Sequence, residues 1–166
     1  MNGQKAGNLR SYIKLNMKKF LLSAFVLVAA MGAKAQLNPV LWSFSATKVG
    51  EKTYEIHMKA TIQANWHLYS QKQPDDAIVS PTVFTINTNP LFSLEGKVKE
   101  VGKMELMKDA NLGISANQYA TSVDFVQKIK LKANVKTNFT GNVEFQTCDD
   151  KKCLPAKKVA FNIAIQ

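Results

Sequence analysis

The chain has 166 residues, with 22 basic and 12 acidic side chains and a formal net charge of +10 at pH 7. Residues 1–35 hold six of the basic residues and no acidic one, so 36–166 carries 16 basic against 12 acidic residues. The part 36–166 also lacks arginine. Proteins that recognise nucleic acid use arginine for bidentate contacts to guanine and for stacking. This composition, with a mild and dispersed excess of lysine, therefore argues against a nucleic-acid partner.

The first 35 residues have the pattern of a secretory signal peptide. Basic residues come first, an apolar run extends from Phe20 to Met31, and a small-residue Ala-Lys-Ala site ends at Ala35. The apolar run is shorter than the roughly 20 residues that a membrane-spanning helix needs. Met17 is a plausible true start that leaves a signal of ordinary length. The sequence predicts cleavage after Ala35 and export of 36–166, as a single domain, to the periplasm or the exterior.

Apolar and polar residues alternate along much of the exported part, which is typical of half-buried strands. The expected strands cover residues 40–46, 54–62, 82–86, 91–94, 98–101, 123–131, 143–147 and 159–165. Turn-forming residues separate them, and no segment has a convincing helical period. A series of roughly seven to nine short strands favours an all-β fold, an immunoglobulin-like β-sandwich.

Three stretches between these strands are harder to interpret. Residues 104–119 follow neither period, so we expect a long loop there, with one helical turn at 104–108. Residues 138–141 are expected to turn the chain into the next strand. The segment Asn65–Tyr69 is a compact aromatic patch. Aromatic residues in such a place more often pack in a sheet than bind a ligand.

The two cysteines, Cys148 and Cys153, lie in the polar link between the last two predicted strands. This position places them at the tip of a hairpin, outside the core. In the loop-entropy model a disulfide across so short a link stabilises the fold by about 2 kcal/mol, against about 4–5 kcal/mol for a hundred-residue loop. Such a bridge is a weak staple that a partner thiol can reach easily, so a structural and a redox role both stay open.

The charges in this link differ at its two ends. Asp149 and Asp150 follow Cys148, whereas Lys151 and Lys152 precede Cys153. Carboxylates disfavour a nearby thiolate and ammonium groups favour it. The pattern predicts that Cys153 is the more acidic thiol when the pair is reduced.

Two other kinds of cysteine chemistry fit the sequence poorly. A zinc site needs two further ligands, and the histidines, His57 and His67, are far from the cysteines in sequence. A cysteine hydrolase needs a cysteine–histidine pair oriented by a third group, which the sequence does not reveal. We expect neither a metal nor an organic cofactor.

The cysteine segment resembles that of a known family. A strand ending in Gln146-Thr147-Cys148, a polar link, and Cys153-Leu154-Pro155 before the last strand resemble the cysteine hairpin of the N-terminal periplasmic domain of the thiol:disulfide interchange protein DsbD. The segment 65–69 is similar to the early aromatic segment of that family, and the order of features agrees over most of 40–166. The resemblance implies an immunoglobulin-like sandwich whose Cys148–Cys153 pair cycles between disulfide and dithiol, with Cys153 facing the partner.

The resemblance also implies partners and a shield for the pair. In the family, a thioredoxin-like domain served by a membrane-embedded thiol carrier donates electrons. The acceptors are periplasmic disulfide isomerases and the thioredoxins of cytochrome c maturation. A cap loop covers the cysteines, which implies that 104–119 is the cap. The implied shielding or partner-contact residues are Trp66, His67, Tyr69, Leu106 and Met107.

The sequence departs from the family pattern in two places. Ala156 stands where the family often has a second proline, and the sequence ends at Gln166, directly after the last predicted strand. We therefore expect the electron donor to be a separate protein, or the domain to have been adapted to another role. The alternative function, from a different class, is a secreted non-enzymatic β-sandwich binding module with a structural disulfide. A structural bridge resists mild dithiols, whereas an exchanging bridge equilibrates with them.

Overall fold

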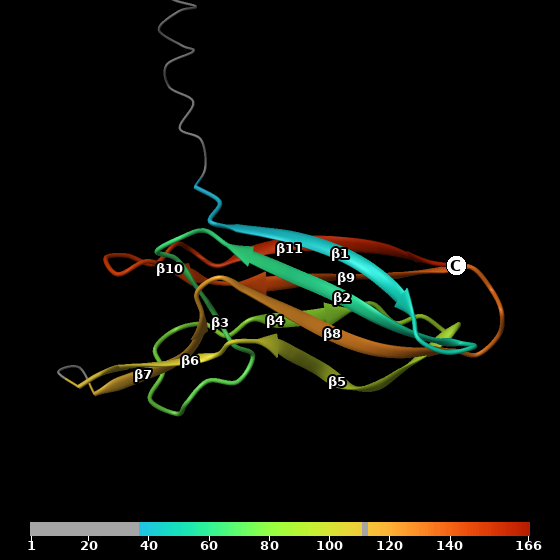
Figure 1. Ribbon diagram of the computed structural model, residues 1–166, viewed down its shortest axis with the longest axis horizontal. Helices are drawn as coiled ribbons and strands as arrows, with labels where there is room; N and C mark the ends of the chain where they lie inside the picture. The colour runs from blue at the N-terminus through green and yellow to red at the C-terminus, as the bar shows by residue number, and fades with distance from the viewer. Residues whose placement is uncertain (1–36, 111–112) are drawn as a thin grey trace, which may run out of the picture. The chain divides into compact units, whose positions relative to one another are not determined.

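Eleven antiparallel strands make up the part of the chain that this computed structural model describes, residues 37–110 and 113–166 (Figure 1). They are β1 (Val40–Lys48), β2 (Thr53–Ile62), β3 (His67–Tyr69), β4 (Val83–Ile86), β5 (Phe92–Gly102), β6 (Glu105–Asp109), β7 (Ile114–Tyr119), β8 (Ser122–Leu131), β9 (Thr137–Phe145), β10 (Thr147–Cys148) and β11 (Lys157–Ile165). No helix in these residues has the length and apolar character needed to cross a membrane. The predicted signal peptide, residues 1–35, lies outside the described residues.

Two of the three sheets form a sandwich around the main core. Sheet A has the strand order β1-β2-β8-β5, and sheet C has the order β11-β9-β4. Aromatic rings from both sheets meet between them: Phe125 of β8 lies 4.9 Å from Phe84 of β4, and Trp42 of β1 lies 5.3 Å from Phe145 of β9, measured between ring centroids. The prediction of an all-β, immunoglobulin-like sandwich is confirmed.

The alternating sequence pattern explains why sheet A forms. In β2 every second residue, from Tyr54 to Ile62, is buried, and β8 repeats this pattern from Val123 to Leu131. One of these inward residues is polar. The Gln127 side-chain amide donates to the carbonyl of Lys128 at 2.7 Å and to the carbonyls of Glu95 and Gly96 at 3.4 Å. These bonds satisfy a buried amide, as a stable core requires.

Strand β5 differs from the sequence-based expectation because it contains a bulge. Residues 91–94 and 98–101 were expected to be two strands, yet they belong to one strand that pairs with β8 on both sides of a register shift between Glu95 and Lys99. Gly96 has a φ of 74° within this bulge, which a residue with a side chain adopts with strain.

The expected turn at 138–141 is wrong, because these residues lie within β9 and pair with β11. Gly141 lies within the strand, and packing explains why this residue is a glycine. A Cβ atom there would collide with the carbonyl oxygen of Thr85 in β4 and come within 2.7 Å of the ring of Phe161 in β11. The glycine therefore marks a close approach of three strands, which is one of the meanings of glycine in a sheet.

The expected loop and helical turn within 104–119 are also wrong. The segment contains strands β6 and β7, which pair with each other from Glu105↔Gln118 to Asp109↔Ile114. We call these two strands the β6–β7 arm. The arm belongs to sheet B, with the strand order β10-β3-β7-β6. In Figure 1, sheet B lies at the end of the sandwich away from the C-terminus.

Candidate redox site

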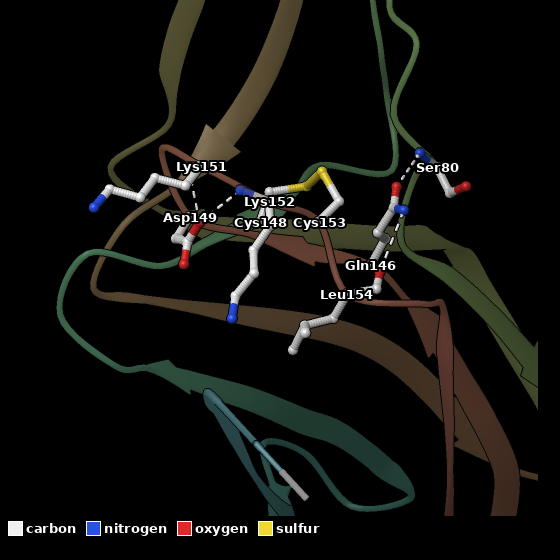
Figure 2. Close-up of a disulfide and its surroundings, with 8 residues drawn as sticks. All are labelled: Ser80, Gln146, Cys148, Asp149, Lys151, Lys152, Cys153 and Leu154. Carbon is white, nitrogen blue, oxygen red and sulfur yellow. Dashed lines mark hydrogen bonds between the residues drawn. A yellow bond between two sulfur atoms is a disulfide. The ribbon is translucent and has the colours of Figure 1, made fainter.

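The two cysteines form a disulfide at the end of sheet B (Figure 2). Cys148 ends β10, and Cys153 faces it as an antiparallel bridge partner, with 3.9 Å between their Cα atoms. Asp149 builds the turn between them. Its carboxylate oxygen Oδ1 accepts hydrogen bonds from the main-chain N–H groups of Lys151 at 2.8 Å and Lys152 at 2.7 Å. This is the local bonding that makes aspartate a frequent turn residue.

These hydrogen bonds also fix the charge of Asp149. The main-chain N–H of Lys151 lowers the pKa of this carboxyl most, and the N–H and charge of Lys152 lower it further. Asp149 thus stays ionised beside Cys148. In Figure 2 the side chains of Lys151 and Lys152 extend away from the sulfur atoms. The greater acidity of the Cys153 thiol stays a prediction.

Gln146 secures the base of the turn against a neighbouring loop. Its side-chain oxygen accepts from the main-chain N–H of Ser80 at 2.9 Å, and its side-chain nitrogen donates to the carbonyl of Leu154 at 3.4 Å. The main-chain N–H of Leu154 in turn donates to the carbonyl of Thr147 at 2.9 Å. The disulfide is thus held in place by hydrogen bonds on both sides, independently of the S–S bond.

The two ends of the disulfide differ sharply in exposure. Only 4% of the Cys148 surface is accessible, whereas Cys153 is exposed. Cys148 packs in a small cluster with buried Tyr69 and Ala116, which half-buried Val79 and Met107 complete. The expectation that both cysteines lie outside the core is therefore wrong for Cys148, because the chain enters sheet B at β10 and carries this side chain inward.

Strand β3 brings two residues of the aromatic segment, His67 and Tyr69, close to Cys148. His67 is the direct partner of Cys148 in the β10–β3 pairing, and it is half-buried. Tyr69, two residues further along, joins the cluster around Cys148, and burial raises the pKa of its phenol. Trp66 differs: it is buried in the main core of the sandwich, apart from this cluster. We therefore place His67 and Tyr69 at the site and Trp66 in the main core.

The two residues expected to shield the pair have different places. They are neighbours on β6, so their side chains point to opposite faces of sheet B. Met107 is paired with Ala116 and packs against the cluster that contains Cys148, whereas Leu106 has 51% of its surface exposed. Met107 therefore belongs to the surroundings of the buried cysteine, and Leu106 does not.

Two groups at the site were missed by sequence reasoning. Ala116 and Val79 contact the Cys148 cluster, yet small or aliphatic residues in segments without periodicity give no signal. Glu100 of β5 was also missed. Its carboxylate accepts hydrogen bonds from the Ser70 hydroxyl at 2.7 Å, the Gln71 main-chain N–H at 2.7 Å and the Tyr119 hydroxyl at 2.6 Å. Glu100 thereby ties the end of β3 to β5 and β7.

The site offers no evident place for a metal. Within residues 37–110 and 113–166, no three histidine, cysteine, aspartate or glutamate side chains are grouped closely enough to hold an ion. The groups that lie closest to Cys148 in sheet B and can take part in chemistry are the imidazole of His67 and the phenol of Tyr69.

Comparisons with known proteins identify the family of this chain. Residues 35–164 match the family model of the N-terminal domain of the thiol:disulfide interchange protein DsbD. The structure is similar to the N-terminal domain of Neisseria meningitidis DsbD in the reduced form, with a TM-score of 0.50 and 15% identity over 78% of this chain and 90% of that chain. It is also similar to the N-terminal periplasmic domain of ScsB from Proteus mirabilis, with a TM-score of 0.48 and 15% identity over 74% of this chain and 44% of that chain. No curated protein sequence gives a significant match. The matched family model covers most of the chain, and the chain therefore belongs to the family of N-terminal domains of the thiol:disulfide interchange protein DsbD.

Proposed function

We propose that residues 36–166 form an exported domain that relays reducing equivalents between thioredoxin-fold partners through Cys148 and Cys153. Membership of a thiol:disulfide interchange family supports this function. The signal peptide predicted for residues 1–35 supports a periplasmic location. An oxidising compartment also suits a closely spaced pair that rests as a disulfide.

The unequal exposure of the two sulfur atoms is the observation that carries this proposal. A partner thiolate can approach the exposed Cys153, while the cluster with Tyr69 and Met107 covers Cys148. Attack on Cys153 Sγ forms the mixed disulfide and breaks the Cys148–Cys153 bond, so the electron pair of that bond leaves on Cys148. The second thiol of the donor then attacks the donor sulfur that is bonded to Cys153. This step forms the donor's disulfide and releases Cys153 as a thiolate.

Delivery of electrons follows the same path in reverse. Cys153 attacks the disulfide of an acceptor, and Cys148 resolves the mixed disulfide by attacking Cys153, which restores the internal bond. Each transfer moves two electrons and needs no cofactor. As donor we propose a thioredoxin-like domain served by a membrane thiol carrier. As acceptors we propose a periplasmic disulfide isomerase or a cytochrome c maturation thioredoxin. Such redox encounters are typically small and transient.

A purely structural role for the bridge fits the geometry less well. Strands β9 and β11 on either side are already joined by nine register pairs, from Lys157↔Phe145 to Ile165↔Thr137. The turn is held by Asp149 and Gln146 as well. A disulfide across so short a loop adds about 2 kcal/mol in the loop-entropy model. We propose further that Met107 and the β6–β7 arm act as the shield that limits access to Cys148.

The decisive experiment is the thiol–disulfide equilibrium of the protein, without its signal peptide, against a thioredoxin-like dithiol. Alkylation and mass measurement report the state of the cysteines. We expect reversible reduction, and a trapped mixed disulfide in Cys148→Ser but not in Cys153→Ser. A bridge that stays oxidised in a folded protein would replace this proposal with the alternative, a binding module with a structural disulfide.

A further inference from the structure

His67 and Cys148 are direct partners across the antiparallel pairing of β3 with β10. Residues in such a position have side chains on the same face of the sheet, with Cβ atoms about 4.5–5.5 Å apart. The packing confirms which face this is: Tyr69, which shares the face of His67 on β3, lies in the cluster around Cys148. The imidazole is therefore a close polar neighbour of the buried sulfur.

Cys148 needs such a neighbour, because its charge changes in every cycle while its surroundings are apolar. When the disulfide is reduced, Cys148 leaves as a thiolate inside a cluster formed by Tyr69, Ala116, Val79 and Met107. Burial disfavours this anion. It must take up a proton there, and it must lose that proton again before it can attack Cys153.

We propose that His67 is the group that gives this proton to Cys148 and takes it back. This role rests on the proposed exchange function. During reduction, the imidazolium of His67 protonates the Cys148 thiolate as the S–S bond breaks, and the neutral imidazole then recovers a proton from solvent. During delivery of electrons, the neutral imidazole removes the proton of the Cys148 thiol, and the thiolate attacks Cys153 in the mixed disulfide. His67 is half-buried, so it connects the buried sulfur with water.

The other ionisable groups around His67 are poorly suited to this task. On the turn, the Asp149 carboxyl has a lowered pKa and its Oδ1 already accepts two main-chain hydrogen bonds. The Lys152 side chain extends away from the sulfur atoms in Figure 2. On β3, burial raises the pKa of Tyr69, which keeps the phenol protonated.

The strands beyond β3 add no better group. On β7, Ala116 and Gln118 of the same face are not ionisable, and on β6, Glu105 forms an ion pair with Lys103 at 3.4 Å. Imidazole is the side chain whose unperturbed titration falls between pH 5 and 8, where a group can both give and take a proton.

The chain provides a matched control in its second histidine. His57 lies on β2 in sheet A, opposite Ser45 and Val126, and its Nδ1 is 2.8 Å from the carboxylate of Asp124. It shares no strand pairing with β10. His57→Gln therefore removes an imidazole from the protein without changing the surroundings of Cys148.

The test measures the reactivity of the Cys148 thiol alone, in the reduced Cys153→Ser variant. Iodoacetamide is the probe, and the rate of alkylation is followed by mass from pH 5 to pH 9. In this background we expect His67→Gln to slow the reaction about tenfold near pH 7. This is less than the roughly 10²–10⁴-fold typical of a general base, because His67 is only half-buried and water at its place could also take the proton. The inflection due to histidine is also expected to disappear from the pH profile. The same background with His57→Gln is expected to keep both the rate and the inflection.

A second variant separates proton transfer from damage to the fold. In His67→Ala, added imidazole should restore the rate of alkylation, which lost packing alone would not allow. An unchanged pH profile in His67→Gln, or no rescue of a slowed His67→Ala, would overturn the role of His67. Failure of the proposed function would give a different result. The unmodified protein would then not exchange with a dithiol, whatever the pH dependence of Cys148 alkylation.

Discussion

The hydroxyl of Tyr119 in β7 donates a 2.6 Å hydrogen bond to the carboxylate of Glu100 in β5, which joins sheet B to sheet A. Ser70 and Gln71, at the end of β3, donate to the same carboxylate. The end of β3, which carries His67, and strand β7 of the arm are thus both hydrogen-bonded to Glu100. These hydrogen bonds therefore link sheet B, which holds the redox site, to sheet A of the sandwich.

We predict that Glu100→Gln destabilises the protein at neutral pH by about 1.5–3 kcal/mol, the range for hydrogen bonds to a charged group. Burial raises the pKa of Glu100, but the hydrogen bonds of Tyr119, Ser70 and Gln71 outweigh it and lower the pKa from 4.5. A lowered pKa in the folded state means that this stabilisation is complete above the unfolded-state value and is lost as pH falls through the folded-state value.

Urea unfolding at pH 7 and pH 3 checks this prediction. The difference between the unmodified protein and Glu100→Gln should shrink at pH 3. Glu144→Gln is the control, because Glu144 is exposed and has only a surface pair with Lys158 at 3.1 Å, an interaction worth about 0–1 kcal/mol. A difference that is the same at both pH values would contradict the assigned role of the Glu100 charge.

Gly141→Ala is predicted to destabilise the sandwich by about 1–3 kcal/mol, as overpacking of a core typically does. The new methyl group would collide with the Thr85 carbonyl oxygen and the Phe161 ring, and the carbonyl belongs to the rigid backbone of β4. Denaturant unfolding measures the effect. Gly50→Ala is the comparison, since the atom nearest its added Cβ is 3.3 Å away on the side chain of Thr53. Equal stability of the two variants would refute the close approach at Gly141.

Met107→Ala should make the disulfide react several-fold faster with a small thiol such as dithiothreitol, because it removes the proposed shield, a side chain that packs against the cluster of Cys148. Leu106→Ala is the matched control: it shortens the adjacent side chain on the opposite face, which is exposed. Stopped-flow reduction, followed by alkylation, compares the two variants. If both react alike, Met107 is not the shield.

Reduction of the disulfide should leave the protein folded and lower its free energy of unfolding by only about 2 kcal/mol, since the loop is short. Near-UV circular dichroism and urea unfolding with and without a dithiol give the two values. The conditions must keep the thiols unmodified. A reduced protein that unfolds outright would show that the bridge serves mainly to stabilise the fold.

The sequence predicts the sandwich well because its strands bury one face. The apolar–polar alternation around Ile56 and Phe125 matches the alternation of buried and exposed side chains in β2 and β8. Prediction from this alternation fails for β6 and β7, where the apolar Leu106 is exposed and the polar Ser115 is buried. Strand pairing between them, which depends on hydrogen bonds rather than on side-chain type, decides the structure there.

The site is predictable in its chemistry but not in its arrangement. The cysteines and the nearby aromatic segment are recognisable as a motif. The facing of His67 and Cys148 arises from a pairing of only two register positions between segments about 80 residues apart, which no local pattern encodes. Trp66 and Tyr69 pack in different clusters for a similar reason. Strand β3 begins at His67, so Trp66 lies outside the strand and Tyr69 within it.

Strand β6 of the β6–β7 arm packs near the redox site and outside the main core of the sandwich. Strand β6 contributes no residue to the main core, and its link to the redox site is the contact of Met107. If Met107 is the proposed shield, substitutions along β6 are expected to change the access of thiols to the disulfide while the melting temperature of the sandwich stays nearly constant. Access to the disulfide and thermal stability would then depend on different residues, and each could be engineered without disturbing the other.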